Sequence, residues 1–314
     1  MKKTLLYAAL LLTIVCAGSC KKSEEDTTKP SLSGLALEGN YSNFMAVGSE
    51  VYVRANIDDL IGSDGTTPET VGIYYTSQSG ARDTLTTDVR KSNPYYSITL
   101  EEAGTYSVIC YAFAGDDYYT TSTSLSIVSV DPETAISGLA GEITDIDGTP
   151  YYCMEAGGKT WMGNNLYSTL SGSNYQDSEV MASVFGKYYS WEEAQYACPE
   201  GWHLPTAQEF DQCLGGRAGA LMVNATFIDV TMWSYWPAVS ISNATSFNAL
   251  PVGYMDFTNS TTPEGGYKEY ACFWTADEKD GLGIYRYIFE QSDTVQKGQG
   301  SKESLAMSVR CVKD

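Results

Sequence analysis

The sequence predicts two domains, an all-β domain followed by an α+β domain. The chain has 314 residues, which is enough for about two domains. All six tryptophans lie at or after Trp161, so the two halves differ in composition. Short strand-like runs fill residues 32–130, whereas paired helix-start signals occur within residues 188–214. A hydrophobic fraction of 43% suffices for packed cores and argues against a disordered chain.

The first residues have the pattern of a secretory signal. Met1-Lys2-Lys3 is a basic start, and the apolar run 4–15 is too short to span a bilayer. Ala17-Gly18-Ser19-Cys20 resembles a lipobox, in which residues 1–19 are removed and Cys20 becomes the lipidated first residue. Each buried lipid methylene contributes about 0.8 kcal/mol to anchoring. The alternative is ordinary signal-peptidase cleavage beside a chance cysteine.

Residues 20–31 would then form a lipidated tether. Lys21-Lys22 followed by Ser23–Asp26 resembles the export signal that sends lipoproteins of Bacteroidetes to the outer face of the outer membrane. We therefore expect a lipid-anchored protein of the outer membrane that is exposed at the cell surface. The alternative is a solvated tether without an export function.

The charge balance argues against one class of partner. The chain has 19 Lys+Arg against 39 Asp+Glu, a formal net charge of -20. Removal of the leader would take Lys2 and Lys3 with it and leave the mature chain more acidic. Such acidity repels nucleic acid and anionic lipid headgroups. We therefore expect no nucleic-acid partner.

The first domain, residues 32–131, reads as a β-sandwich. Its expected strands are rich in β-branched and aromatic residues, are separated by turn residues, and lie at 51–55, 71–75, 96–100, 106–113 and 124–130. The runs Gly72–Tyr75, Gly104–Tyr106 and Tyr111–Ala114 resemble a fibronectin type III-like module, so the resemblance implies a fibronectin III/Ig-like sandwich. Cys110 alternates with apolar residues on one strand face, which predicts a buried thiol.

Two short helices are predicted in the second domain. Ser190–Glu193 fits a capping box, and Pro199 stops the helix that it begins. Thr206–Glu209 is a second capping box, and Gly215-Gly216 ends that helix. The segment between them contains Trp202, which we expect to lie in the core.

Several motifs of the second half occur in a characteristic order. They are Asp147–Tyr152, Lys159–Leu166, Tyr188–Trp191, Cys198–Thr206, Phe247–Gly253, Phe273–Thr275 and Ser308–Asp314. Together they resemble the Fibrobacter succinogenes major paralogous domain over residues 136–314. That family is similar to the C-type-lectin-like and formylglycine-generating-enzyme folds, so the resemblance implies a C-type-lectin-like α+β domain. It implies a fold and a cellular setting, but no reaction.

The resemblance also implies one disulfide. Cys198 and Cys311 match family positions and resemble the helix-to-last-strand bridge of C-type-lectin-like domains. In the chain-entropy model, a disulfide that closes a loop of this length stabilises the fold by about 4–5 kcal/mol. Oxidising compartments allow such bridges to persist. The pairing of the remaining mature cysteines stays open; they are Cys110, Cys153, Cys213 and Cys272.

The sequence contains no complete catalytic or metal-binding pattern. His203 is the one histidine, so it would have to serve any Ser-His-Asp or Cys-His arrangement. Its place between two helices favours a structural role. The cysteines are scattered and form no Cys-x-x-Cys pair, and Asp145–Gly148 provides only half of a calcium loop. We expect no catalytic residue, no metal and no cofactor.

The remaining candidate residues are aromatic. Trp233, Tyr235, Trp236 and Tyr254 lie in the long irregular middle of the second domain. In C-type-lectin-like folds this region supplies the ligand loops, and the tripeptides with which sugar-binding lectins hold calcium are absent here. We therefore expect any glycan recognition by this domain to be independent of calcium and to be carried by aromatic stacking on these four side chains. The alternative is that Trp233 and Trp236 are core residues.

The function that follows is a non-catalytic surface binding or adhesion module, with a glycan or a host protein as ligand. The alternative is a structural component of a surface assembly, in which the sandwich acts as a spacer. An enzyme is the least favoured of the three.

Overall fold

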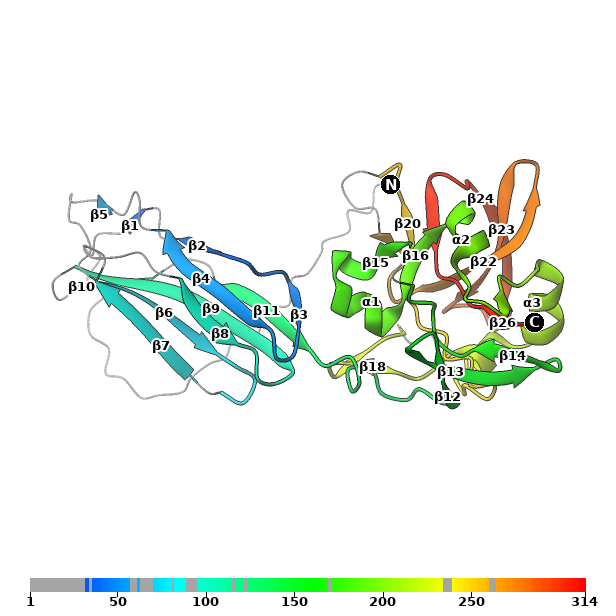
Figure 1. Ribbon diagram of the computed structural model, residues 1–314, viewed down its shortest axis with the longest axis horizontal. Helices are drawn as coiled ribbons and strands as arrows, with labels where there is room; N and C mark the ends of the chain where they lie inside the picture. Colours follow the sequence, from blue (N-terminus) through cyan, green and yellow to red (C-terminus); the bar gives the residue numbers. More distant parts are fainter. Residues whose placement is uncertain are drawn as a thin grey trace.

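The structure is a computed structural model, in which the strands up to β11 form one body and the later elements form another (Figure 1). It describes residues 32–33, 36–56, 61–62, 70–80, 82–88, 95–114, 117–120, 124–168, 171–233, 239–259 and 264–314. The predicted signal peptide 1–19 and tether 20–31, including Cys20, lie outside these residues. So do Tyr235 and Trp236. Within the described ranges, no helix is long and apolar enough to cross a bilayer.

In its described residues, the first body consists of strands and contains no helix. They are β1 (Leu32–Ser33), β2 (Ala36–Gly39), β3 (Phe44–Ala46), β4 (Glu50–Asn56), β5 (Ile61–Gly62), β6 (Thr70–Thr76), β7 (Arg82–Asp88), β8 (Tyr96–Thr99), β9 (Gly104–Ala114), β10 (Asp117–Thr120) and β11 (Leu125–Val130). One sheet has the order β2-β4-β8, and a second has the order β3-β11-β9-β6-β7 with β10 beside β9. The pairing of β3 with β11 is parallel, whereas β9 pairs antiparallel with both β6 and β11.

One apolar core lies between these two sheets. Val51 and Ile98 come from the three-stranded sheet, and Ile73, Val108 and Cys110 come from the larger one. All five are at most 1% exposed. Alternation along each strand directs every second side chain to the shared interior. The prediction that Cys110 is buried is confirmed.

The second body mixes short helices with several sheets. Its helices are η1 (Tyr175–Asp177), α1 (Glu179–Phe185), α2 (Trp191–Ala197), α3 (Ala207–Leu214) and α4 (Ala218–Leu221). Its strands are β12 (Glu142–Ile146), β13 (Thr149–Ala156), β14 (Lys159–Met162), β15 (Ser173–Asn174), β16 (Lys187–Ser190), β17 (Trp202–His203), β18 (Thr226–Phe227), β19 (Val230–Thr231), β20 (Tyr254–Asp256), β21 (Glu264–Gly265), β22 (Tyr270–Lys279), β23 (Leu282–Phe289), β24 (Gln296–Gly300), β25 (Leu305–Met307) and β26 (Val312–Lys313).

Three sheets organise this second body. The first has the order β12-β13-β14-β26-β17, the second β15-β16-β25-β20-β21 and the third β22-β23-β24. The segment that links α2 to α3 contains the short strand β17, which pairs with β26 in the first of these sheets. Trp202 in β17 is half-buried and packs against a core cluster, so it lies at the margin of the core rather than inside it.

Both predicted capping boxes are present. The Ser190 side chain accepts a hydrogen bond from the Glu193 backbone, and the Glu193 side chain accepts one from the Ser190 backbone. Thr206 and Glu209 make the same reciprocal pair at the start of α3. The predicted disulfide is also present, because Cys198 at the end of α2 bonds Cys311 just before β26 with Cα atoms 5.8 Å apart. The bridge ties the helical segment to the C-terminal strand.

An apolar cluster continues from one body into the other. Val130, at the end of β11, is fully buried in a cluster with Met181 and Phe185 of α1. Phe44 of β3 packs against this cluster, and its carbonyl oxygen accepts a hydrogen bond of 3.4 Å from the Ser178 hydroxyl. The contact fixes the edge of the first body against α1.

Candidate ligand-binding pocket

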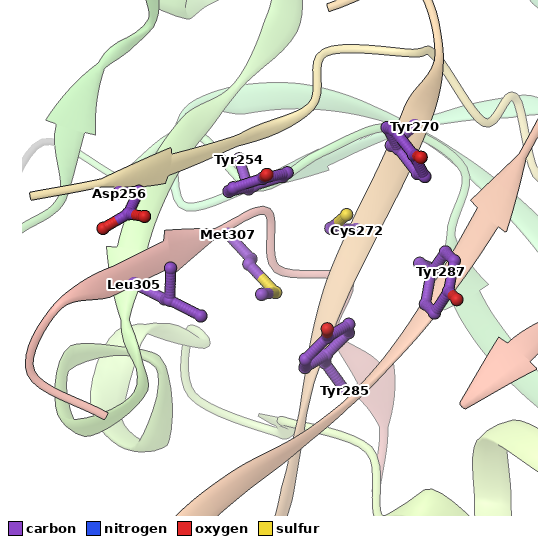
Figure 2. A pocket seen from close by; sticks show the side chains of 8 residues that line it. All are labelled: Tyr254, Asp256, Tyr270, Cys272, Tyr285, Tyr287, Leu305 and Met307. Carbon is purple, nitrogen blue, oxygen red and sulfur yellow. The ribbon is translucent and has the colours of Figure 1, made fainter. Parts of the chain in front are cut away.

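A hollow of about 340 Å³ opens between the β22-β23-β24 sheet and the strands β20 and β25. Its lining consists of four tyrosines, one carboxylate, two sulfur-bearing side chains and a leucine: Tyr254, Asp256, Tyr270, Cys272, Tyr285, Tyr287, Leu305 and Met307. Figure 2 shows these side chains arranged around the hollow. Its volume lies at the lower end of the range for small-ligand sites, which is about 300–1,000 Å³.

Strand register brings the tyrosines of β22 and β23 to one face. Cys272 lies opposite Tyr287, and Tyr270 lies opposite Phe289. Directly opposed residues of an antiparallel pair share a face, and so do residues two apart on one strand. Tyr285 therefore joins Tyr287 on the same face, and both face the hollow from β23.

Ring-to-ring contacts hold these tyrosines in place. Tyr270 stacks on Phe289 with ring centroids 4.7 Å apart and planes inclined by 8°. Tyr287 lies 6.0 Å from Tyr270 and 5.8 Å from Tyr285, and Tyr285 meets Trp274 edge-on at 5.7 Å. All of these separations lie within the favourable range for aromatic pairs, about 4.5–7 Å. The aromatic wall is thus ordered by its own contacts.

Two glycines make room for this wall. A Cβ atom at Gly298 of β24 would collide with the ring of Tyr285, and one at Gly266 would come within 2.5 Å of the Tyr270 ring. A side chain at either position would therefore displace a pocket tyrosine.

The opposite wall comes from β20 and β25. Tyr254 and Asp256 are two apart on β20 and point to the same side, while Leu305 lies opposite Asp256 on β25. Asp256 Oδ1 accepts hydrogen bonds from the Thr258 backbone nitrogen at 3.0 Å and from the Thr258 hydroxyl at 2.6 Å. These bonds lower the pKa of Asp256, so its carboxylate is charged at neutral pH.

The most buried lining residues are sulfur-bearing. Cys272 is 3% exposed and Met307 is 2% exposed. Burial raises the pKa of the Cys272 thiol to about 12, so it is neutral and unreactive at physiological pH. Burial also raises the pKa values of Tyr254, Tyr270 and Tyr285, which keeps these phenols protonated as donors and acceptors of hydrogen bonds.

The structure separates the predicted aromatic residues. Tyr254 lines the pocket. Trp233 is 2% exposed, belongs to a buried core cluster of the second body, and donates from Nε1 to the Ala249 carbonyl oxygen at 3.2 Å. The structure therefore supports the core alternative for Trp233 and does not offer its ring to a ligand. Trp233 shares this buried cluster with Phe210, Phe247 and Met222.

Three pocket tyrosines were not singled out from the sequence. Tyr270, Tyr285 and Tyr287 lie on the two strands of one hairpin, joined by the turn Asp280-Gly281. The alternation of Tyr285, Tyr287 and Phe289 along one strand is a sequence signal for a shared aromatic face. Trp233 stands out in the sequence instead, because it lies in the long irregular middle of the domain.

His203 has partners on both ring nitrogens. Nδ1 lies 2.5 Å from Asp314 Oδ1, and Nε2 lies 3.2 Å from Glu209 Oε1. Lys159 Nζ lies 2.8 Å from the same Glu209 oxygen. Burial would raise the pKa of Glu209, but hydrogen bonds from Lys159, Thr206 and His203 outweigh it and lower the pKa to about 2. This cluster ties β14, β17 and α3 together.

In the described ranges, no metal-binding cluster lies at the tyrosine pocket or at His203. Over the ranges that the structure describes, no three His, Cys, Asp or Glu side chains gather closely enough to hold a metal ion. Cys153, Cys213 and Cys272 are free thiols, of which Cys153 and Cys272 are buried.

The sequence profile of the Fibrobacter succinogenes major domain (Fib_succ_major) matches residues 154–313, half of the chain. The chain belongs to this family. Every residue of the tyrosine pocket and both cysteines of the disulfide lie within the matched residues. The pocket is therefore a feature of the Fib_succ_major domain, whereas the first β body precedes that domain.

Comparisons with solved structures and with curated proteins give no support for a particular function. Among solved structures, the chain is similar to the adhesin InvE of Yersinia pseudotuberculosis at 11% identity, over 90% of this chain and 70% of that one. The TM-score of 0.27 is too low to carry an argument about the fold or the function of the Fib_succ_major protein. No curated protein matches the chain.

Proposed function

We propose that this protein is a non-catalytic binding module and that the tyrosine pocket is its ligand contact site. The observation that carries the proposal is the set of four tyrosines around one hollow, three of them on one hairpin. Rigid aromatic side chains offer large contact area at low conformational cost, and their hydroxyls add hydrogen bonds.

The ligand class that fits this lining is a glycan. A sugar ring presents C–H groups on its faces and hydroxyls at its edges, which suits tyrosine rings beside a carboxylate that accepts hydrogen bonds. Asp256 supplies that carboxylate, and a hollow of about 340 Å³ suits a ligand of sugar size. Binding should be independent of calcium, because the calcium-holding tripeptides of related lectins are absent from the sequence.

The setting that we propose is the outer face of the outer membrane. A lipid on Cys20 would anchor the chain, and Lys21-Lys22 followed by acidic residues would direct its export. Protease treatment of intact cells tests this setting, with Cys20→Ala as the control. Protection of the wild-type protein from the protease would indicate a periplasmic orientation instead.

We further propose that the first body is a fibronectin III/Ig-like sandwich and the second a C-type-lectin-like domain. Two sheets around one core support the first assignment. The bridge from α2 to the segment before β26 supports the second.

A structural role in a surface assembly is the second candidate. The apolar cluster that joins Val130 and Phe44 to α1 favours it, because a fixed junction lets the first body act as a spacer. An enzyme is the least favoured reading: both ring nitrogens of His203 are occupied by carboxylates, and Glu209 is also held by Lys159 and its capping box.

A glycan screen on residues 32–314 tests the proposed function. Binding should persist in EDTA and should be lost in Tyr285→Ala, whereas Tyr196→Ala, at a tyrosine that is 90% exposed on α2, should bind as the wild type does. Loss of binding in EDTA, or equal binding by Tyr285→Ala, would contradict it. Absence of glycan binding together with self-association would favour the structural role.

A further inference from the structure

The pocket lining carries one charged side chain, and that charge is negative. Asp256 stands among tyrosines, two apolar side chains and a neutral thiol, and the described lining residues include no lysine or arginine. Its Oδ1 is occupied by Thr258. In the described part of the chain no group donates to its Oδ2, so this oxygen remains available to a ligand. Figure 2 shows Asp256 at the edge of the hollow, next to Tyr254 and Leu305.

A second carboxylate lies close to the aromatic wall. Glu269 directly precedes Tyr270, and its side chain is exposed. Burial first, and then nearby groups that include Glu269, raise the pKa values of both Tyr254 and Tyr270. A carboxylate therefore lies near each wall, Asp256 at one and Glu269 at the other.

The tyrosine rings add to this preference. The face of an aromatic ring carries negative charge density and attracts a cation that lies within about 6 Å of its centroid. The ring centroids of Tyr270 and Tyr287 lie 6.0 Å apart, and those of Tyr287 and Tyr285 lie 5.8 Å apart. A cationic group in the hollow would therefore lie near several rings at once. An acidic group would meet the same rings and Asp256 with repulsion.

We infer that the pocket takes a sugar residue with a protonated amino group in preference to its neutral counterpart, and that Asp256 determines this preference. The inference rests on the proposed function, because it assumes that a glycan occupies the pocket. The protonated amine donates to Asp256 Oδ2 while the tyrosine rings contact the sugar. Sugars with carboxylate or sulfate groups are rejected. The net charge of -20 favours cationic ligands everywhere on the surface, whereas the role of Asp256 is local and can be separated by substitution.

The experiment is calorimetric titration of the full-length protein, purified in a neutral detergent, with oligosaccharides that share one backbone. The probes are β-1,4-linked glucosamine, N-acetylglucosamine and glucuronic acid oligomers, at a mildly acidic pH at which the amine is protonated. We expect the amino oligomer to bind about tenfold more tightly than the N-acetyl oligomer. The acidic oligomer should bind least.

Two variants separate the effect of the Asp256 carboxylate on ligand preference from the effect of the overall negative charge. Asp256→Asn should reduce binding of the amino oligomer to the level of the N-acetyl oligomer and leave the latter within about twofold. Asp280→Asn is the matched control, because Asp280 is exposed in the β22–β23 turn with φ 54°, a conformation that asparagine accepts. It should preserve the preference.

The outcomes distinguish this inference from the proposed function. Equal affinity for the amino and N-acetyl oligomers, with binding that Tyr285→Ala abolishes, would overturn the inference and leave the proposed function standing. An unchanged preference in Asp256→Asn would overturn the inference in the same way. Failure of all three oligomers to bind would overturn both.

Discussion

Arg310 lies over the ring of Phe247, with its guanidinium carbon 4.4 Å from the ring centroid, and is fully buried with no carboxylate partner among the described residues. Its Nε donates to Asn165 Oδ1 at 2.8 Å, and its Nη atoms donate to the backbone carbonyls of Met162, Phe247 and Asn248. Burial lowers its pKa to about 9. One side chain therefore joins the segment after β14, the segment after residue 246 and the C-terminal segment.

Replacement of Arg310 should be strongly destabilising. Arg310→Met leaves several buried oxygens without donors, and each unsatisfied group costs about 1–3 kcal/mol. We expect a loss of at least about 3 kcal/mol in the free energy of unfolding, measured by denaturant titration. Arg217→Met is the control, because Arg217 makes an exposed ion pair with Asp293 and should cost less than about 1 kcal/mol. Similar losses in the two variants would contradict this account of Arg310.

Removal of the disulfide should lower stability by a comparable amount. Cys198 and Cys311 enclose a loop with a sequence separation of 113. In the chain-entropy model the bridge contributes about 4–5 kcal/mol. The double variant Cys198→Ser/Cys311→Ser should show that loss in chemical denaturation, and a reducing agent should then have no further effect. A stability unchanged by the double substitution would argue that the bridge does not form in the native protein.

Trp233→Ala should affect folding rather than ligand recognition. The side chain is 2% exposed and lies in the core, so its truncation should cost about 3–5 kcal/mol. Thermal melting and glycan binding should be measured on the same sample. Protein that remains folded should bind as the wild type does. Normal stability with lost binding would instead restore Trp233 as a contact residue.

These cases show which features could be predicted from the sequence and why others could not. The helix starts at Ser190 and Thr206 could be predicted because a capping box is contained within four residues. The Cys198–Cys311 bridge followed from the family resemblance and not from local pattern. The pocket required pairing between strands distant in sequence. Tyr254 and Trp233 are alike in local sequence pattern. Only the tertiary packing shows that Tyr254 lines the pocket and that Trp233 lies in the core.

Acid should destabilise the protein in part through Glu209. Its pKa is about 2 in the folded state against 4.5 for a free glutamate, so its contribution is present above about pH 4.5 and is lost as the pH falls toward 2. Lys159→Met removes one of its partners and should reduce the fall in stability over this interval. This prediction is tested by measuring the free energy of unfolding of wild type and variant from pH 6 to about pH 2. Identical pH profiles for variant and wild type would contradict this role of Lys159.

Gly298 should control the position of a pocket tyrosine. A Cβ at this position would collide with the Tyr285 ring, so Gly298→Ala should displace that ring and weaken glycan binding. Gly216→Ala is the control, because a Cβ there meets nothing within 4 Å. Both variants should fold, as judged by circular dichroism. Unaltered binding in Gly298→Ala would argue against Tyr285 as a contact.

The most direct test of the central claim is to observe the tyrosines themselves during ligand titration. Tyrosine side chains labelled with carbon-13 and assigned by Tyr→Phe substitution can be followed by NMR while the glycan from the screen is added. The account predicts that signals of Tyr254, Tyr270, Tyr285 and Tyr287 shift together and saturate, while that of exposed Tyr196 stays fixed. Tyr52 and Tyr95 are exposed tyrosines of the first body. Shifts confined to these two, with the four pocket signals unchanged, would contradict the account.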